Sequence, residues 1–387
     1  MENTPRLYDT LFGILRQCRQ WLDVRHLKTL TWMVVGLRQS GKVSLTAWVP
    51  YVTSRAQYAQ STVRRFDRWL DNARVNVHQL YGPLIQQALQ DWGDSRLRLA
   101  LDTSLLWEQY CIVRVSVIYR GRAVPLVWTV LEHGSSSVAY QTYAFLLDQA
   151  ATLLPLGCTV EFLADRGFAD TALLRHLKTL GWHWRIRIKR SFQVYRHGKF
   201  RKLKRVTLAQ GQARFWHAVW ITKDYYGPVH LALARPRGGK DYWYVVSDEP
   251  TGQTTFAEYA VRFDIEENFL DDKSNGFQLE TSLIRSAQAL TRLCFVLAVA
   301  TLYLTAQGTA VVAANQRRRV DPHWFRGNSY LRIGWNWIKM ALTTGEPLLA
   351  RVRLVGTPDP DPPRASNRQF HKRQLHRRNA ILSILYA

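Results

Sequence analysis

The sequence predicts an α/β protein in which a core of strands and helices carries a β-rich insertion and follows a helical N-terminal domain. Two observations predict this fold class. Hydrophobic residues make up 47% of the chain and aromatic residues 12%, which is the composition of a folded core. Apolar residues recur at helical spacing at both ends of the chain and in strand-like alternation between them. The expected boundaries are 1–92 for the N-terminal domain, 93–290 for the core with its insertion at about 190–250, and 291–387 for a helical C-terminal region with a basic tail.

Residues 1–92 have the spacing of helices. Leu7, Leu11 and Ile14 recur on one helical face, and Leu27 and Leu30 begin a second such pattern. The segment 61–71 (STVRRFDRWLD) resembles a helix start and places its arginines near one side. Such a helix suits a surface that lies on DNA, and it equally suits a solvated basic face.

The core begins near Arg96, where the pattern changes to alternation. Its expected strands and helices follow one another as strands at 96–102, 111–119 and 124–131, a helix at about 138–154, a strand at 158–165, a helix at about 171–180 and a strand at 183–188. The turn Arg120-Gly121-Arg122 makes the second and third strands a hairpin. Three antiparallel strands, helix, strand, helix, strand is the order of a ribonuclease H-like fold.

Two further segments complete the chain. Strand patterning at 216–223, 230–235 and 242–247 predicts the β insertion, and a helix follows from about Phe256. Residues 293–316 carry no charge and are long enough to span a membrane. Because Gln307, Gly308 and Thr309 interrupt the apolar run, we expect a helix buried in a large core and no membrane partner.

The charge of the chain indicates a polyanionic partner. Fifty-three Lys and Arg against 29 Asp and Glu give a net charge of +24, and such an excess favours binding to nucleic acid phosphates. Residues 285–387 carry 16 basic and four acidic side chains. A second basic run, 185–205, is expected to line a DNA channel with Lys189 and Arg190 near the active site, the alternative being a solvated ribbon. The basic tail at 364–378 is either a DNA contact or a loose end.

The cysteines and the N-terminal residues indicate the cellular compartment in which the protein is expected. Four isolated cysteines show no zinc-ligand spacing, which suits a reduced cytoplasm and argues against a zinc finger. The first residues show an amphipathic pattern in place of a signal peptide. We therefore expect a cytoplasmic protein.

Two acidic residues stand at the ends of predicted strands. Asp102 ends RLRLALD and Asp165 ends CTVEFLAD, so their side chains meet if the two strands are neighbours. Converging carboxylates are what two-metal phosphodiester chemistry requires, and Mg²⁺ prefers such oxygen ligands. A strand-end turn residue is the ordinary explanation of either Asp alone.

A third acid lies in an unusual helix pattern. Tyr259, Arg262, Glu266 and Lys273 fall within about a 60° arc at about 100° per residue, so they share one face of a regular helix. Glu266 is expected to bind metal, and the two cations are expected to hold phosphates. A salt-bridge lattice is the alternative. The neighbouring acids, Glu267, Asp271 and Asp272, are expected to be solvated.

These motifs resemble those of a large group of bacterial insertion-sequence transposases, the insertion-sequence-4 family. The helix matches its signature Y-x2-R-x3-E-x6-K at all four positions. The segments LDTS at 101–104 and LADRGF at 163–168 are similar to its first and second Asp motifs. The resemblance covers roughly residues 95–290.

The resemblance implies a DDE transposase that cuts and pastes DNA through a hairpin intermediate. Asp102, Asp165 and Glu266 would be catalytic and would hold two Mg²⁺ ions, for which Mn²⁺ substitutes. The implied DNA contacts are those of Tyr259, Arg262, Lys273, Lys189, Arg190 and Trp243, the last stacking on a flipped base.

The implied partners are double-stranded DNA, as terminal inverted repeats and target, and a second subunit on paired ends. Two alternatives remain open. A ribonuclease H-like nuclease would cut DNA with the same acids without joining it. A transposase-derived DNA-binding protein would bind DNA without catalysis.

Overall fold

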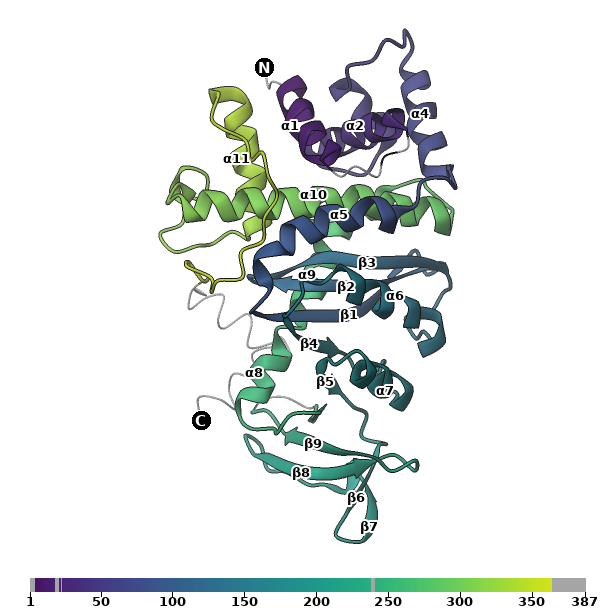
Figure 1. Cartoon of the computed structure of the whole chain (residues 1–387), viewed down its shortest axis with the longest axis vertical. Helices are drawn as coiled ribbons and strands as arrows, with labels where there is room; N and C mark the ends of the chain where they lie inside the picture. Colours follow the sequence, from purple (N-terminus) through teal and green to yellow (C-terminus); the bar gives the residue numbers. More distant parts are fainter. Residues whose placement is uncertain (1–3, 18–20, 22, 238–240, 364–387) are drawn as a thin grey trace.

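The computed structural model describes residues 4–17, 21, 23–237 and 241–363 of the 387. Figure 1 shows an elongated molecule in which helices from both ends of the chain gather at one end and a β ribbon forms the other. A single large sheet joins the two ends. Helix α10 runs beside β3 at the first edge of this sheet.

Helices occupy the first part of the chain. Their bounds are α1 Thr4–Arg16, α2 Val24–Ser40, α3 Leu45–Trp48, η1 Val49–Tyr51, α4 Ala59–Asp71, α5 Val77–Leu89 and η2 Gln90–Trp92. The expected apolar stripe of α1 is buried at Leu7, Leu11 and Ile14. Helix α4 begins at Ala59, two residues before the expected start, and its arginines face partly outward.

The central sheet has ten strands in the order β3-β2-β1-β4-β5-β10-β9-β8-β6-β7. Their bounds are β1 Arg96–Leu106, β2 Tyr110–Tyr119, β3 Arg122–Glu132, β4 Thr159–Ala164, β5 His183–Arg187, β6 Gln193–Arg196, β7 Lys199–Lys202, β8 Ala213–Ile221, β9 Tyr226–Ala234 and β10 Trp243–Ser247. Helices α6 Tyr140–Leu153 and α7 Thr171–Thr179 connect β3 to β4 and β4 to β5. The order of strands and helices from 96 to 188 is therefore the expected one.

The expected β insertion extends the sheet instead of forming a separate unit. Strand β10 pairs antiparallel with β5, with Val245 opposite Arg187. Strands β9, β8, β6 and β7 then continue outward. The backbone groups at the free edge of β5 are thus satisfied by a strand from later in the chain, which fixes the insertion rigidly to the core.

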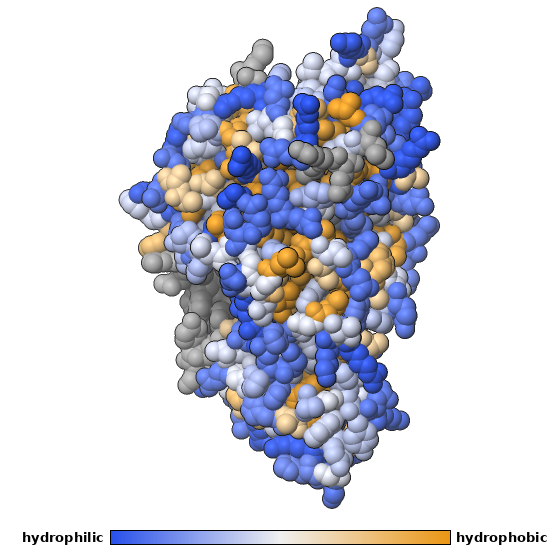
Figure 2. All heavy atoms as spheres, in the orientation of Figure 1, coloured by the Kyte–Doolittle hydropathy of each residue, from blue (hydrophilic) through white to orange (hydrophobic). Residues whose placement is uncertain are grey.

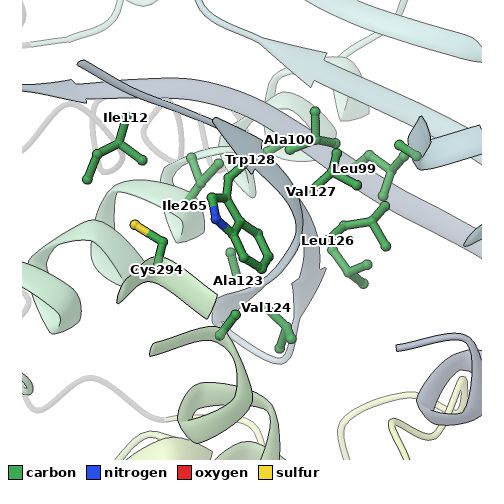
Figure 3. Close-up of a cluster of buried hydrophobic side chains, with 14 of the residues drawn as sticks. Leu99, Ala100, Ile112, Ala123, Val124, Leu126, Val127, Trp128, Ile265 and Cys294 are labelled. Carbon is green, nitrogen blue, oxygen red and sulfur yellow. The ribbon is translucent and has the colours of Figure 1, made fainter. Parts of the chain in front are cut away.

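Helices after the sheet cover the core. Their bounds are α8 Thr254–Ala260, α9 Phe263–Leu270, the π-helix η4 Asp271–Asn275, η5 Leu279–Thr281, α10 Ala287–Ala313, η6 Arg317–Arg319 and α11 Tyr330–Thr344. Both α6 and α9 pack against β2 and β3. Trp128 of β3 lies in this core beside Ile265 of α9 and Cys294 of α10 (Figure 3), and its indole N–H donates to the Thr291 carbonyl at 2.9 Å.

Helix α10 is long and apolar enough to cross a membrane, but 94% of its apolar window is buried inside the protein. The residues that interrupt its apolar run have packing roles. A Cβ at Gly308 would lie 1.9 Å from the Tyr330 carbonyl oxygen, so the glycine permits the close crossing of α11. The Gln307 side chain accepts a hydrogen bond from the Leu349 N–H at 2.8 Å. These contacts fit the expected core helix.

Candidate active site

The three predicted acids line one pocket of about 540 Å³. Asp102, Asp165 and Glu266 come from β1, the end of β4 and α9, and Lys189 and Lys273 line the same pocket. The remaining lining residues are mainly small or polar: Thr103, Ser104, Ser136, Ser137, Arg166, Gly167, Phe168, Phe269 and Leu270. Five of the nine residues predicted as functional therefore meet at one place, although they are spread over more than 170 positions of the chain.

Sheet register brings the two aspartates together. Strands β1 and β4 are parallel, and Leu101 lies opposite Ala164, so Asp102 and Asp165 follow at adjacent positions. The Thr103 N–H donates to the Asp102 carboxylate at 2.9 Å, and the Thr103 hydroxyl donates to the Ser136 carbonyl at 2.9 Å. The hydroxyl contact holds the serine-containing loop of the pocket against β1.

The helix that carries Glu266 is not the regular helix that the spacing predicts. Helix α8 ends at Ala260, α9 begins at Phe263, and Lys273 lies within the π-helix η4. The four signature residues consequently do not form an exposed row. Tyr259 and Arg262 are buried, whereas the Glu266 side chain is 49% exposed.

Arg262 is an internal bridge in this structure. Its guanidinium donates to Asp102 at 3.0 Å and to Glu266 at 2.6 Å, and its Nε lies 3.1 Å from the Tyr259 hydroxyl. Arg262 is buried and three of its N–H groups already have partners in the protein, so this structure does not present it to a phosphate, and the expected direct contact would require the ion pair to open. Tyr259 likewise lies behind Arg262, away from the pocket lining.

Burial perturbs the acid–base properties of the site. Desolvation raises the pKa of Asp102 to about 6, although the charge of Arg262 opposes the shift. Desolvation also raises the pKa of Tyr259 to about 12. Burial lowers the pKa of Lys273, against the nearby charge of Glu280, and its ammonium donates to the Leu105 carbonyl. A carboxyl that resists ionisation in a cleft is typical of a functional site.

Asp271 and Asp272 are buried, contrary to expectation, whereas the Glu267 side chain is 47% exposed, as expected. Asp272 is 1% exposed and pairs with the fully buried Arg114 of β2 at 2.6 Å. Asp271 accepts from Arg122 of β3 at 3.0 Å, and Glu267 lies 3.5 Å from the same arginine. Asp271 and Asp272 belong to the π-helix η4 and pair with arginines of the sheet. Two arginines on neighbouring strands thereby fix the helix that presents Glu266.

Trp243 does not offer a surface for a flipped base. The residue is 1% exposed, Arg187 lies over its ring at 4.7 Å, and Tyr259 meets it edge-on at 5.7 Å. The expected stacking role is therefore corrected, because the protein's own side chains pack around the indole. Arg187 of β5, which belongs to the basic run 185–205, is buried against this indole. Burial lowers the pKa of Arg187, and the nearby charges of Tyr259 and Asp165 oppose that shift.

The basic run 185–205 divides into two parts. Arg185 and Arg187 are buried, and Arg185 pairs with Glu161 at 3.1 Å and Glu258 at 2.7 Å. Lys189 is exposed and lines the pocket. Arg190 is exposed outside the pocket lining and stacks on Tyr242 at 4.9 Å. The predicted tail contact at 364–378 lies outside the described residues.

The donor set suits a hard divalent cation. Three carboxylates in one pocket are the oxygen ligands that Mg²⁺ and Mn²⁺ prefer. Within the described part of the chain, no three His, Cys, Asp or Glu side chains are already arranged to hold an ion. Arg262 pairs with two of the carboxylates, Asp102 and Glu266, and the Glu266 side chain is half exposed. The residues fit a metal once this ion pair opens.

Comparison with known proteins identifies the family. The model described as "Transposase DDE domain" matches residues 108–303, which is just over half of the chain, and the chain belongs to this family. Its function is accordingly that of a DNA transposase. The match includes Asp165 and Glu266, and Asp102 lies six residues before it. No curated protein matches the sequence.

Among solved structures, the chain is similar to a piggyBac transposase in a synaptic complex with hairpin DNA. The identity is 10% and the TM-score is 0.46, over 89% of this chain and 81% of that one.

Proposed function

We propose that this transposase cleaves DNA at the ends of its element and transfers the freed strand into target DNA by a cut-and-paste route. The observation that carries the proposal is the pocket in which Asp102, Asp165 and Glu266 converge with two lysines. Three acids and two phosphate-binding cations around one open cleft are the groups that phosphodiester cleavage and transfer require.

The framework that supports the site is proposed to be a ribonuclease H-like core. Strands β1, β4 and β5 run parallel at the centre, and β2 and β3 are antiparallel beside β1. The helical segment at 1–92 and the region at 291–387 are proposed as its N-terminal and C-terminal additions. The pocket opens where β1 and β4 place their aspartates side by side.

The three acids are proposed to hold two Mg²⁺ ions, with Mn²⁺ as a substitute. Bound there, the ions would activate water or a 3′-hydroxyl and stabilise the leaving oxygen. Lys189 and Lys273 lie in the pocket lining and would contact the phosphates that flank the scissile bond. Arg262 holds Asp102 and Glu266 in place until the substrate complex forms.

The proposed partners are double-stranded DNA and a second copy of the chain. Terminal inverted repeats would supply the cleaved ends, target DNA would receive them, and a homodimer would pair two ends. The place of action is proposed to be the cytoplasm, at the bacterial nucleoid. A hairpin intermediate belongs to the same proposal.

A ribonuclease H-like nuclease is the second candidate function. It is favoured by one observation: Trp243 is buried and Arg262 is paired internally, so two residues expected to handle a hairpin are not presented to DNA. Such a nuclease would hydrolyse DNA with the same acids and would leave the ends unjoined.

A strand-transfer assay separates the two functions. Purified protein would be incubated with Mg²⁺, a supercoiled target plasmid and a labelled duplex that carries the element's own end, already cut to expose its 3′-hydroxyl. A transposase converts label into plasmid-sized product. Nicked donor DNA without any joined product would refute the transposition proposal and favour the nuclease, and DNA binding with neither product would indicate a non-catalytic protein.

A further inference from the structure

The hairpin of β6 and β7 carries a dense group of cations at the free edge of the sheet, which we term the ribbon cluster. The ribbon cluster consists of six exposed side chains: Arg196, Lys199, Arg201, Lys202, Lys204 and Arg205. None of them forms an ion pair within the ranges that the structure describes. Residues 171–223 contain 14 Lys and Arg and not one Asp or Glu. The end of the molecule that holds β6 and β7 in Figure 1 is largely hydrophilic in Figure 2.

The ribbon cluster rests on a stiff support. His197 and Gly198 have φ values of 49° and 74°, the conformation of a tight two-residue hairpin turn. On one face of the two strands, Tyr195, Phe200 and Tyr225 pack against one another with ring centroids 4.7 to 5.1 Å apart. By the register of the hairpin, Arg196, Lys199 and Arg201 lie on the opposite face. A preformed cationic surface loses little conformational freedom when it binds a partner.

Protection of an edge strand explains only part of this arrangement. Lysines at a free edge discourage pairing with other strands, and Lys199 and Lys202 on β7 suffice for that purpose. Lys204 and Arg205 lie beyond the strand, and there is no carboxylate in the surrounding sequence to balance them. Like charges this close repel one another until an anion neutralises them, and the repeated anion that matches such a row is the phosphate backbone of duplex DNA.

The position of the ribbon cluster relates it to the pocket. Strand β7 is seven strands away from β1, which carries Asp102. At about 4.8 Å per strand, the separation across the sheet is about 34 Å, close to one helical turn of DNA. We propose that the ribbon cluster binds the phosphates of a duplex about one helical turn away from the end that lies in the pocket. The spacing of one helical turn rests on the proposed function, because it is counted from a DNA end held in the pocket. The contact itself is with phosphates and is therefore independent of base sequence.

Two charge variants test the contact. K199Q/R201Q/K202Q removes three cations from β7, and K204Q/R205Q removes two from outside the edge strand. The matched control K28Q/K178Q/K339Q removes three exposed lysines from α2, α7 and α11. Binding is measured without metal by fluorescence anisotropy, over a salt series, on duplexes of about 8 to 20 base pairs that carry the element's own end.

Wild type and the control are expected to gain affinity as the duplex grows past about 10 base pairs, and the two ribbon variants are expected to lose that gain. The slope of log K against log salt should fall by up to about 2.7 for the triple variant and about 1.8 for the double variant. Ribbon variants that match the control in slope and in length dependence would overturn the proposal and leave edge protection as the explanation.

Adding Mg²⁺ to the same samples separates this proposal from the proposed function. Length-dependent binding without any cleavage by wild type would refute the catalytic proposal while the ribbon contact stands. Cleavage without length dependence would refute the ribbon contact alone.

Discussion

Replacing Asp102 with Asn should stabilise the metal-free protein at neutral pH. The Asp102 carboxylate is held in a desolvated position at the end of the apolar part of β1, and its pKa is raised to about 6 from an ordinary value of 3.8. A group whose pKa is raised in the folded state favours folding when it is protonated. Its ionisation therefore costs stability as the pH rises from about 4 to about 6, and the cost stays constant above that range.

The size of the effect follows from the shift. Each pKa unit corresponds to about 1.4 kcal/mol, so a rise from 3.8 to about 6 corresponds to about 3 kcal/mol at pH 7. Asparagine keeps the shape of the side chain without the charge and should recover that free energy of unfolding. With an unfolding entropy of about 2.1 cal/mol/K per residue, the melting temperature should rise by about 4 °C.

Thermal unfolding in EDTA between pH 4 and pH 8 measures this effect. The stability difference between Asp102→Asn and wild type should be near zero at pH 4 and should reach its full size by about pH 6 to 7. The variant Asp67→Asn, which removes an exposed carboxylate from α4, should show no such pH dependence. If Asp102→Asn is less stable than wild type at pH 7, the ion pair with Arg262 outweighs the burial of the carboxylate and the reasoning fails. In a parallel series without EDTA, added Mg²⁺ should raise the melting temperature of wild type and of Asp67→Asn, but not that of Asp102→Asn.

Three further predictions concern other parts of the structure. Asp272→Ala leaves Arg114 buried without its charged partner and should lower the free energy of unfolding by about 3 to 5 kcal/mol in chemical denaturation. The double variant R114M/D272L should recover most of that loss. A double variant that is as unstable as Asp272→Ala would contradict this prediction. Gly308→Ala forces α10 and α11 apart and should cost at least about 1 to 3 kcal/mol in the same assay, and an unchanged midpoint would contradict the close crossing. Lys189→Gln, at an exposed position, should leave the melting temperature unchanged and reduce the salt slope of DNA binding by about one; an unchanged slope would remove Lys189 from the DNA contact.

Local patterns were sufficient to predict the strands and helices of the core. Alternation marked β1 to β5. The acids at the ends of RLRLALD and CTVEFLAD were expected to meet if their strands are neighbours, and the parallel pairing of β1 with β4 meets that condition. The apolar stretch within α10 was likewise predicted to be a core helix, because Gln307 and Thr309 interrupt it and buried polar side chains need hydrogen-bond partners inside the protein.

Features that depend on distant contacts were not predictable in the same way. The spacing correctly places Tyr259, Arg262 and Glu266 side by side, since Arg262 contacts both of the others, but it does not reveal the turn that separates α8 from α9. Asp271 and Asp272 looked solvated because their partners, Arg122 and Arg114, lie about 150 residues earlier in the sequence. The residues around Asp271 and Asp272 do not reveal that the helix continues as a π-helix, or that its acids pair with arginines of the central sheet.

The burial of Trp243 has a similar cause. A tryptophan at the start of a strand looks the same in sequence whether its ring faces DNA or the core. Its neighbours Arg187 and Tyr259 come from β5 and α8, and only the extended sheet brings them onto the indole.

Cleavage of the element's own end by wild type and by Glu266→Gln tests the central claim most directly. A labelled duplex that carries this end is incubated with protein and either Mg²⁺ or EDTA, and the products are separated on a denaturing gel. The neighbouring variant Glu267→Gln changes the charge identically at a residue outside the pocket lining. Metal-dependent nicking by wild type and Glu267→Gln, with a loss of at least about 100-fold in Glu266→Gln, is the predicted result. Nicking that survives in Glu266→Gln would contradict the assignment of the third acid, and no metal-dependent nicking by wild type would contradict the account of this pocket as an active site.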